Sequence, residues 1–305
     1  MAIDKAVDSA VLDGYFTDIA DAIRAKAETS DTYTPEEMPQ AIADIPAGGD
    51  DLLSLLMNGT ASGDIVFDCD GDVPPGLTIN INPTGSSPFN DQITSLSFPT
   101  ATSVGDSWLR FRSSGFESGR NELKRLDFPL AEKVGEIDIN IWSPFNYCLS
   151  GLTEFNAPKL QTVSRYLCKD AVSLPEIDLP SFINNIGEQA FYRCRSLKIA
   201  DFGRDAVGVK TSKPGRINSN AFNGCSSLVA LIVRYFSGSD IFELASTYVL
   251  ANTPIASGTG YIYVPRDMVD TYKAATNWST YANQIRAVED YTTDGTLTGD
   301  FVLPE

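Results

Sequence analysis

The sequence predicts an α+β protein whose body is a solenoid of short parallel strands and turns. Three observations favour this fold. A cysteine followed by a leucine recurs four times, successive cysteines are 20 to 31 residues apart, and each leucine opens a short run of alternating apolar and polar residues. The pairs are Cys148 and Leu152, Cys168 and Leu174, Cys194 and Leu197, and Cys225 and Leu228. A stack of such repeats presents an extended surface, which favours binding over catalysis.

The repeats are predicted over residues 91–235. Two earlier copies, from Ile93 and Leu123, lack the cysteine, and the pattern L-x-x-L-x-hydrophobic at this period is typical of leucine-rich repeats. The two most regular copies read IGEQAFYRCRSL from Ile186 and INSNAFNGCSSL from Ile217. We expect the strand hydrophobics, the Ala-Phe pair, the cysteine and the leucine of each copy to enter one shared core, with strands of successive coils about 4.8 Å apart.

Residues 1–49 are predicted to form a helical head for attachment or oligomerisation. The second of its two helices begins with a capping box, in which Thr34 is the N-cap, Pro35 the first helical residue and Glu37 the third. Neither helix is able to bury its apolar stripe alone, so the stripes are the candidate attachment residues. They are Phe16, Ile19, Ile23, Met38, Ile42 and Ile45.

Three further segments complete the chain. Residues 50–90 are predicted as a small β linker element, and residues 291–305 as a short hairpin or a loose tail. Residues 236–290 are predicted to cap the solenoid with a strand, YIYV, followed by a helix from Pro265 through Ile285, because a terminal repeat needs a polar outer face.

The acidic run from Asp68 to Asp72 has the composition of a calcium-binding loop but not its full pattern. Val73 stands where the loop glycine belongs, and Ile79 stands where the bidentate glutamate belongs. We therefore predict a solvated turn and no metal site here.

Composition excludes several classes of function. The chain has no histidine, so a Ser-His-Asp triad, a Cys-His dyad and a histidine zinc site are all impossible. The net charge is −17, and residues 1–72 alone hold 16 Asp and Glu against three Lys and Arg. Binding of nucleic acid needs clustered Lys and Arg, so we expect no nucleic-acid partner.

The predicted location and redox state follow from the same reading. The longest apolar runs are too short to cross a membrane, so no membrane insertion is expected. The first residues lack the basic and apolar regions of a signal peptide, so we expect the chain to remain in the cytoplasm until assembly or lysis. The four repeat cysteines are predicted to be reduced, buried thiols, because equivalent positions in successive coils do not converge as zinc ligands do. No cofactor is expected.

The two regular copies resemble the BspA-like leucine-rich repeats. The closing run YIYVPRDMVDTYKAATNWSTYANQIRAV is similar to the segment that ends many such arrays. The head, FTDIADAIRAKAETSDTYTPEEMPQAIADI, is similar to an N-terminal module of tail proteins encoded by phages and prophages of Gram-positive gut bacteria. The copies at Ile93, Leu123 and Leu152 depart from the family pattern because they lack the Ala-Phe pair.

Two aromatic clusters are the candidate binding surface. Trp142, Phe145 and Tyr147 fall within six residues and are interrupted by Pro144, which indicates a loop. Aromatic residues in a loop stack on sugar rings or anchor a protein interface, and the alternative is that they cover the solenoid edge or a subunit contact. The second cluster combines an aromatic residue with cations at Trp108, Arg110 and Arg112.

The resemblance implies a non-enzymatic virion structural protein of a phage tail, baseplate or fibre. Its head would bind other tail or baseplate proteins, its solenoid would bind a neighbouring virion protein or a host cell-surface protein or glycan, and it would act as a homo-oligomer. Two alternatives stay open. One is a bacterial BspA-like surface adhesin, which would need an export signal. The other is a glycoside hydrolase that uses two carboxylates and therefore needs no histidine.

Overall fold

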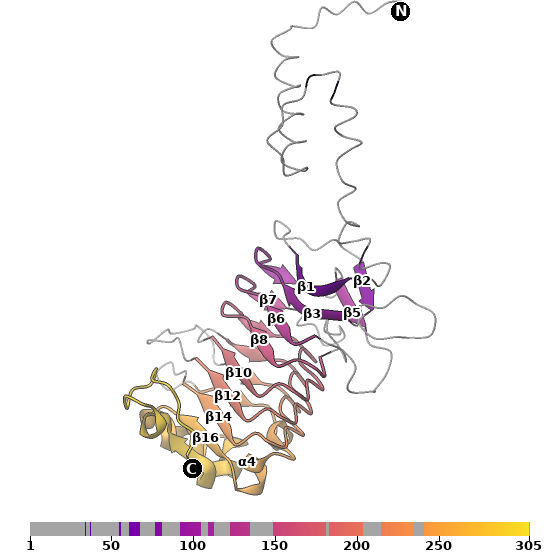
Figure 1. Ribbon diagram of the computed structural model, residues 1–305. Helices are drawn as coiled ribbons and strands as arrows, with labels where there is room; N and C mark the ends of the chain where they lie inside the picture. Colours follow the sequence, from indigo (N-terminus) through magenta and orange to yellow (C-terminus); the bar gives the residue numbers. More distant parts are fainter. Residues whose placement is uncertain are drawn as a thin grey trace, which may run out of the picture. The chain divides into compact units, whose positions relative to one another are not determined.

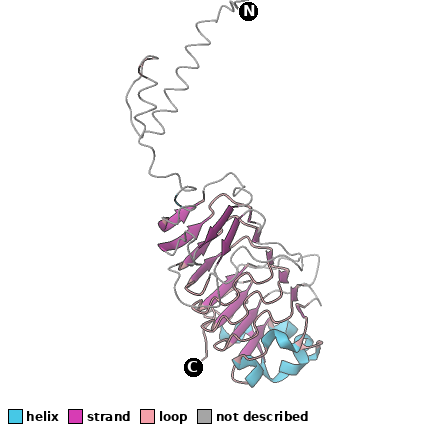
Figure 2. Ribbon diagram, turned by 90° about the vertical axis from the view of Figure 1, so that its right-hand side faces the viewer, coloured by secondary structure: helices cyan, strands magenta, loops and turns pink. Residues whose placement is uncertain are grey.

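The computed structural model describes residues 61–67, 77–80, 92–104, 109–112, 123–134, 149–180, 183–203, 215–234 and 241–304, together with Thr34, Glu37 and Leu55 (Figures 1 and 2). The chain divides into two compact units, residues 1–55 and residues 56–305. The second unit contains every strand described below. Within it the chain winds as a stack of coils, and successive coils add one strand to each of two walls (Figure 1).

Two parallel sheets of longer strands form one wall. The first has the order β1-β3-β6-β8 and consists of β1 (Ser62–Val66), β3 (Gln92–Ser97), β6 (Arg125–Asp127) and β8 (Glu154–Asn156). The second has the order β10-β12-β14-β16-β17 and consists of β10 (Glu176–Leu179), β12 (Ile199–Phe202), β14 (Ala230–Val233), β16 (Tyr261–Val264) and β17 (Ile285–Ala287). This parallel pairing of successive coils confirms the predicted solenoid.

The second wall is a six-stranded sheet of two-residue strands in the order β15-β13-β11-β9-β7-β4. Its strands are β4 (Ser103–Val104), β7 (Lys133–Val134), β9 (Thr162–Val163), β11 (Asn185–Ile186), β13 (Arg216–Ile217) and β15 (Glu243–Leu244). A separate parallel pair joins β2 (Leu77–Asn80) to β5 (Leu109–Arg112). Because β1 pairs with β3, the sheet of the solenoid extends into the segment predicted as a separate β element.

Alternation along each strand decides which side chains enter the core. Leu96, Leu126 and Phe155 share one register position in β3, β6 and β8, and all three are buried. Their neighbours in sequence point to the opposite face, because successive side chains of a strand alternate between faces. The apolar positions of the repeat pattern therefore form the core, and the intervening polar positions form the outer surface.

Equivalent aromatic residues stack in columns from coil to coil. The ring centroids of Phe67 and Phe98 are 4.8 Å apart, and those of Phe98 and Phe128 are 4.9 Å apart. The column of the predicted Ala-Phe pairs gives a similar stack, with 5.2 Å between the rings of Phe191 and Phe222. These separations are close to the spacing of hydrogen-bonded strands, about 4.8 Å, so ring stacking and backbone pairing favour the same coil spacing.

The repeat cysteines are core residues, as predicted. Cys168, Cys194 and Cys225 are reduced and fully buried. The thiol of Cys194 donates to the carbonyl oxygen of Cys168 at 3.0 Å, and the thiol of Cys225 donates to that of Phe191 at 3.0 Å. Burial raises the pKa of the Cys168 and Cys194 thiols, so both remain protonated at neutral pH. Cys148 lies outside the described residues.

Each regular coil contains two residues with left-handed backbone, four positions apart. The pairs are Tyr166 (φ 62°) and Asp170 (φ 60°), Gln189 (φ 54°) and Arg193 (φ 60°), and Asn220 (φ 57°) and Gly224 (φ 80°). Such a conformation costs a residue other than glycine about 1–2 kcal/mol. Hydrogen bonds between coils hold it in place, as where the N–H of Arg193 donates to the carbonyl of Asn223 at 2.9 Å.

The C-terminal cap is made of short helical pieces (Figure 2). They are η1 (Thr247–Leu250), α4 (Pro254–Ser257), η2 (Arg266–Met268), α5 (Val269–Ala274), η3 (Trp278–Gln284) and η4 (Val288–Tyr291). The single helix predicted from Pro265 is therefore wrong in extent. The helix is interrupted at Asn277, which adopts φ 65° and donates its side-chain amide to the carbonyl of Leu244 at 2.7 Å. After this break Trp278 is buried in the core, and its indole N–H donates to the carbonyl of Phe242 at 2.7 Å.

Of the predicted head, the structure describes the capping residues Thr34 and Glu37. The Glu37 carboxylate accepts from the Thr34 backbone N–H at 2.8 Å and from its hydroxyl at 2.9 Å, and these bonds lower the pKa of Glu37. This is the glutamate half of the predicted capping box. The six stripe residues Phe16, Ile19, Ile23, Met38, Ile42 and Ile45 lie outside the described residues.

The tight coil spacing predicts that Gly187→Ala destabilises the protein by about 3 kcal/mol. A Cβ at Gly187 would lie 2.5 Å from the backbone nitrogen of Arg165 and 2.5 Å from the carbonyl carbon of Ser164. Gly63→Ala is the matched control, because no described residue lies within 4 Å of its Cβ and its φ of 72° is what opposes the substitution. Urea denaturation followed by circular dichroism compares the two. Equal stability losses would contradict the coil spacing described above.

Candidate binding face

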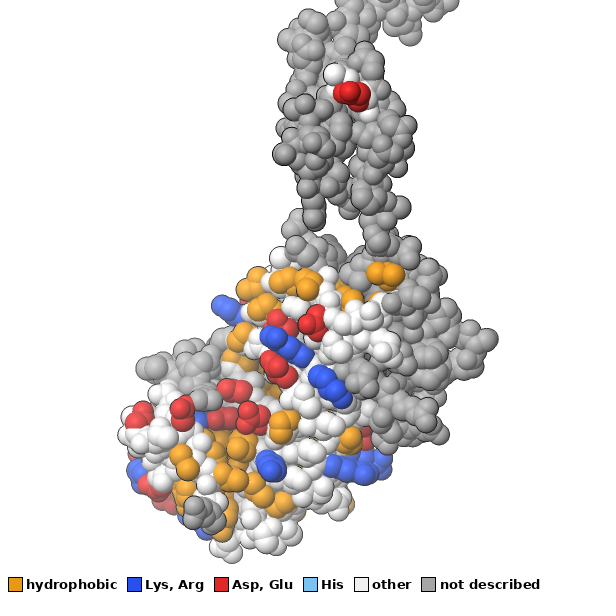
Figure 3. Space-filling model, viewed as in Figure 1, with side chains coloured by type: hydrophobic (Ala, Val, Ile, Leu, Met, Phe, Trp, Pro, Cys, Tyr) orange, Lys and Arg blue, Asp and Glu red, His pale blue; other side chains and the backbone are white. Residues whose placement is uncertain are grey.

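The outer surface of the first long sheet is the candidate site, and we call it the binding face. Two rows of outward side chains cross its four strands. They are Asp64, Ser95, Arg125 and Glu154 in one row and Val66, Ser97, Asp127 and Asn156 in the other. Figure 3 shows charged side chains of both signs over these strands. The face thus offers donors and acceptors at the regular spacing of the coils.

Side-chain hydrogen bonds fix the first row. The Oδ1 atom of Asp64 accepts from the hydroxyls of Ser95 at 2.7 Å and Thr94 at 2.8 Å, both on the next coil. These bonds, Ser95 first and then Thr94, lower the pKa of the Asp64 carboxyl, so it stays charged at neutral pH. Farther along the row, the Nε atom of Arg125 lies 3.3 Å from a carboxylate oxygen of Glu154.

The second row is fixed in the same way around Asp127. One carboxylate oxygen accepts from the amide of Asn156 at 2.6 Å, and the other accepts from the hydroxyl of Ser97 at 3.1 Å. Arg125 also approaches Asp127, at 3.9 Å. Polar groups already held in position lose less conformational entropy when a partner binds, so this face is prepared for a polar interaction.

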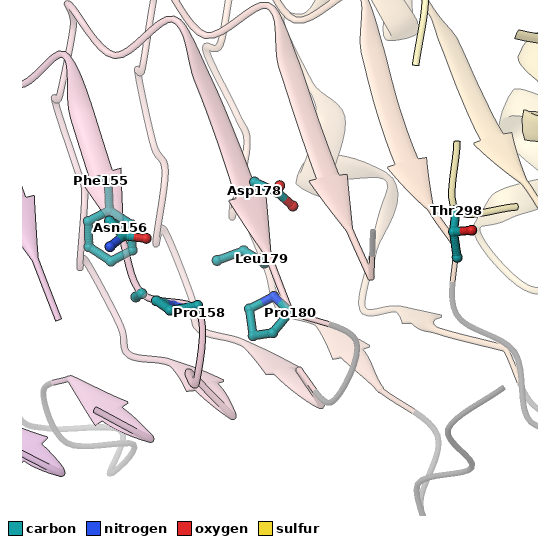
Figure 4. A pocket seen from close by; sticks show the side chains of 8 residues that line it. Phe155, Asn156, Pro158, Asp178, Leu179, Pro180 and Thr298 are labelled. Atoms are coloured by element: carbon teal, nitrogen blue, oxygen red, sulfur yellow. The ribbon is translucent and has the colours of Figure 1, made fainter. Parts of the chain in front are cut away.

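A pocket of about 420 Å³ lies where the first long sheet meets the second. Among the described residues no strand pairing joins β8 to β10, and the pocket occupies this interruption. Figure 4 shows the residues that line it, on β8 and the turn after it, on β10, and on the C-terminal segment. They are Phe155, Asn156, Ala157, Pro158, Asp178, Leu179, Pro180 and Thr298.

The chemistry of the pocket is mixed. Five of its lining residues are apolar, and Asn156, Asp178 and Thr298 supply an amide, a carboxylate and a hydroxyl. Its size lies within the range of ligand pockets, about 300–1,000 Å³, which combine apolar residues with a few polar groups. The pocket is therefore suited to receive one protruding side chain or one sugar ring of a larger partner that spreads over the binding face.

A second hollow, of about 440 Å³, lies on the opposite wall across β9, β11 and β13. Its charged residues pair within the protein, as those of the binding face do. Arg165 lies 3.3 Å from Glu188, and Arg216 lies 3.0 Å from Glu243. The binding face remains the candidate site because its polar side chains form continuous rows across four strands.

The aromatic clusters predicted from the sequence are not tested by the structure. Arg110 and Arg112 belong to β5 by backbone, and their side chains lie outside the described residues. Trp108, Trp142, Phe145 and Tyr147 also lie outside the described residues. Their role stays a prediction.

The residues of the binding face carry no motif in the sequence. They occupy the variable positions between the apolar residues of each repeat, as in the runs TSLS, KRLD and TEFN. Strand alternation alone assigns these positions to the outer surface. Their pairing between coils, such as that of Asp127 with Asn156, depends on how the strands of successive coils are aligned. The repeats differ in length, so this alignment is not apparent from the sequence.

Within the described residues, no group of three or more Cys, Asp or Glu is arranged to hold a metal ion. The acidic run from Asp68 to Asp72 lies outside them. No helix in the described part of the chain is long and apolar enough to cross a membrane.

Comparison with known proteins agrees with the repeat type. Residues 139–241 match the family model of the BspA type leucine rich repeat region, in six copies. Among solved structures, a leucine-rich repeat protein from Bacteroides ovatus is similar, at 18% identity and a TM-score of 0.34, over 62% of this chain and 52% of that chain. This chain thus aligns with about half the length of that protein. No curated protein shows significant similarity to this chain.

Proposed function

We propose that this leucine-rich-repeat protein is a non-enzymatic virion component of a phage tail, baseplate or fibre that holds a macromolecular partner on its binding face. The observation that carries the proposal is the binding face, where outward charged and polar side chains of successive coils are held by one another. The pocket at its border adds a recess for a protruding group. Such a surface supports recognition by complementarity and requires no chemical step.

Two sequence features support the virion setting. The head resembles a module of phage and prophage tail proteins, and the acidic balance of residues 1–72 would keep a free subunit soluble before assembly. In this account the head binds a neighbouring tail or baseplate protein, and the solenoid binds a further virion protein or a host protein or glycan.

A surface adhesin of a bacterial cell is the second candidate, and the same binding face would serve it. The two roles differ in where the protein is found. An adhesin would be exported to the cell surface, and its gene would have no phage genes nearby. A virion component would be found among the proteins that mass spectrometry identifies in purified particles.

Deletion of residues 1–46 is predicted to abolish incorporation into particles while the repeats still fold. The measurement is immunoblotting of purified particles, with circular dichroism of the isolated shortened chain as the folding control. Normal incorporation of the shortened chain would refute the attachment role of the head.

Arg125→Glu is predicted to reduce the proposed binding by at least tenfold without unfolding the protein. Arg125 is 49% exposed, and an exposed ion pair contributes about 0–1 kcal/mol to stability. The substitution would therefore weaken partner binding and change the folding stability little. Arg216→Glu on the opposite wall, where Arg216 is 52% exposed and also paired, is the matched control.

Particles that carry each substitution would be compared for content of the protein and for adsorption to host cells. A defect in content indicates a virion partner, and a defect in adsorption indicates a host partner. If Arg125→Glu and Arg216→Glu behave alike in both assays, the binding face is assigned to the wrong wall.

A further inference from the structure

The outer surface of the second long sheet differs from the binding face because it is apolar and covered over β14 and β16. Its outward residues Ala230, Ile232 and Tyr263 are fully buried, together with Val288. Bare, these side chains would form a contiguous apolar patch beside the polar rows of the first sheet.

The cover is a C-terminal hairpin, residues 291–302 (Figure 1). Tyr291, Leu297 and Phe301 pack against the apolar residues of the sheet. The ring of Tyr263 meets the rings of Tyr291 and Phe301 edge to face, with centroids 4.9 and 4.7 Å apart. The sequence left a short hairpin and a loose tail open for this segment.

Arg234 joins the sheet to the hairpin backbone. Its side chain is fully buried and pairs with Asp201, with Nε 2.8 Å from Oδ1 and Nη2 2.7 Å from Oδ2. Its remaining nitrogen, Nη1, donates to the carbonyl oxygens of Leu297 and Gly299, each at 2.7 Å. A buried guanidinium must have its donors satisfied, so the surface around Arg234 is built to receive two peptide carbonyls that are two residues apart.

Hydrogen bonds within the hairpin hold its shape. The N–H of Thr293 donates to the carbonyl of Asp300 at 2.9 Å, and the N–H of Val302 donates to that of Tyr291 at 2.8 Å. At the tip, the Asp294 carboxylate accepts from the N–H of Thr296 at 2.9 Å. In the described chain, strand pairing of the second long sheet ends at β17, before the hairpin begins.

The connection to the body is anchored just before the hairpin. The carboxylate of Glu289 accepts from the N–H of Arg266 at 3.0 Å, and Asp290 pairs with the Arg266 guanidinium. Release of the hairpin would keep these two anchors and would break the Arg234 bonds and the apolar contacts.

From these observations we propose that the surface around Arg234, Ile232 and Tyr263 is a peptide-binding site, and that two copies of the chain occupy each other's sites by exchanging C-terminal hairpins. The second copy is the occupant because its hairpin carries the same Leu297 and Phe301 side chains and the same two carbonyls. A segment that fits its site within one chain fits the identical site of another, so exchange would reproduce the Arg234 bonds and the apolar contacts between two chains and would close a two-fold dimer. This inference does not depend on the proposed function.

The test begins with a chain that ends at Tyr291 and a synthetic peptide of residues 292–305. By isothermal titration calorimetry, the shortened chain is expected to bind one peptide saturably, and a Leu297→Asp peptide is expected to bind at least tenfold more weakly. In the shortened chain, the paired substitution Asp201→Leu with Arg234→Met is expected to weaken binding at least tenfold, and Arg216→Met is expected to have no effect. The proposed site is refuted if the shortened chain folds but does not bind the peptide, or if it binds the Leu297→Asp peptide equally well.

Exchange is tested by mixing two defective chains. The shortened chain has the site around Arg234 but no hairpin, so it is the acceptor. The full-length Asp201→Leu, Arg234→Met variant has the hairpin but a weakened site, so it is the donor. Light scattering after size-exclusion chromatography is expected to show a complex with one copy of each, which Leu297→Asp in the donor abolishes. Absence of this complex, when the peptide does bind, refutes exchange and leaves the site occupied within one chain.

A second measurement decides the matter if the shortened chain does not fold. Hydrogen exchange of the full-length Asp201→Leu, Arg234→Met variant should show faster exchange at Thr293 and Val302 than the Arg216→Met control. The removal of both charges avoids a lone buried carboxylate. Unchanged exchange at these two amides would show that Arg234 does not hold the hairpin, and the proposal would fail.

Discussion

The repeated stacking of coils at the spacing of paired parallel strands is the constraint on which the structure depends. Backbone hydrogen bonds fix this distance at about 4.8 Å. The Phe67, Phe98 and Phe128 rings obey it, with separations of 4.8 and 4.9 Å. Gly187 obeys it as well, since its position leaves no room for a Cβ beside Ser164 of the preceding coil. The core, the turns and the surface side chains all repeat at this distance.

The same constraint gives the outer wall two different halves. In the first long sheet, the outward positions other than Val66 hold polar residues, and the Asn156 amide of one coil donates to Asp127 of its neighbour. In the second, the row that begins with Asp178 and Asp201 continues with Ile232 and Tyr263, which the C-terminal hairpin covers. The pocket lies between the halves and is lined by residues of both long sheets and of the hairpin. A partner on the polar half would thus lie next to the hairpin.

The sequence predicted what depends on periodicity and missed what depends on register. Spacing of Cys168, Cys194 and Cys225 indicated buried thiols in equivalent coils, and the structure confirms them. The break at Asn277 escaped prediction because the flanking apolar residues keep a helical spacing across it, while tertiary packing of Trp278 decides the backbone. The Arg234–Asp201 pair was also hidden, because the two residues are separated by the polar insertion between two repeats. The candidate site depends on such cross-coil pairs, so only the repeat type and the outward positions were within reach of the sequence.

The central claim is that the polar half of the outer wall holds a macromolecule in the particle. Site-specific photo-crosslinking tests it most directly, with benzoylphenylalanine at the position of Ser97 on the binding face or at that of Tyr248, which is 66% exposed in the C-terminal cap. After irradiation of purified particles, or of particles bound to host cells, the account predicts an adduct with one defined partner from Ser97 and none from Tyr248. No adduct from Ser97, or the same adducts from both positions, would contradict it.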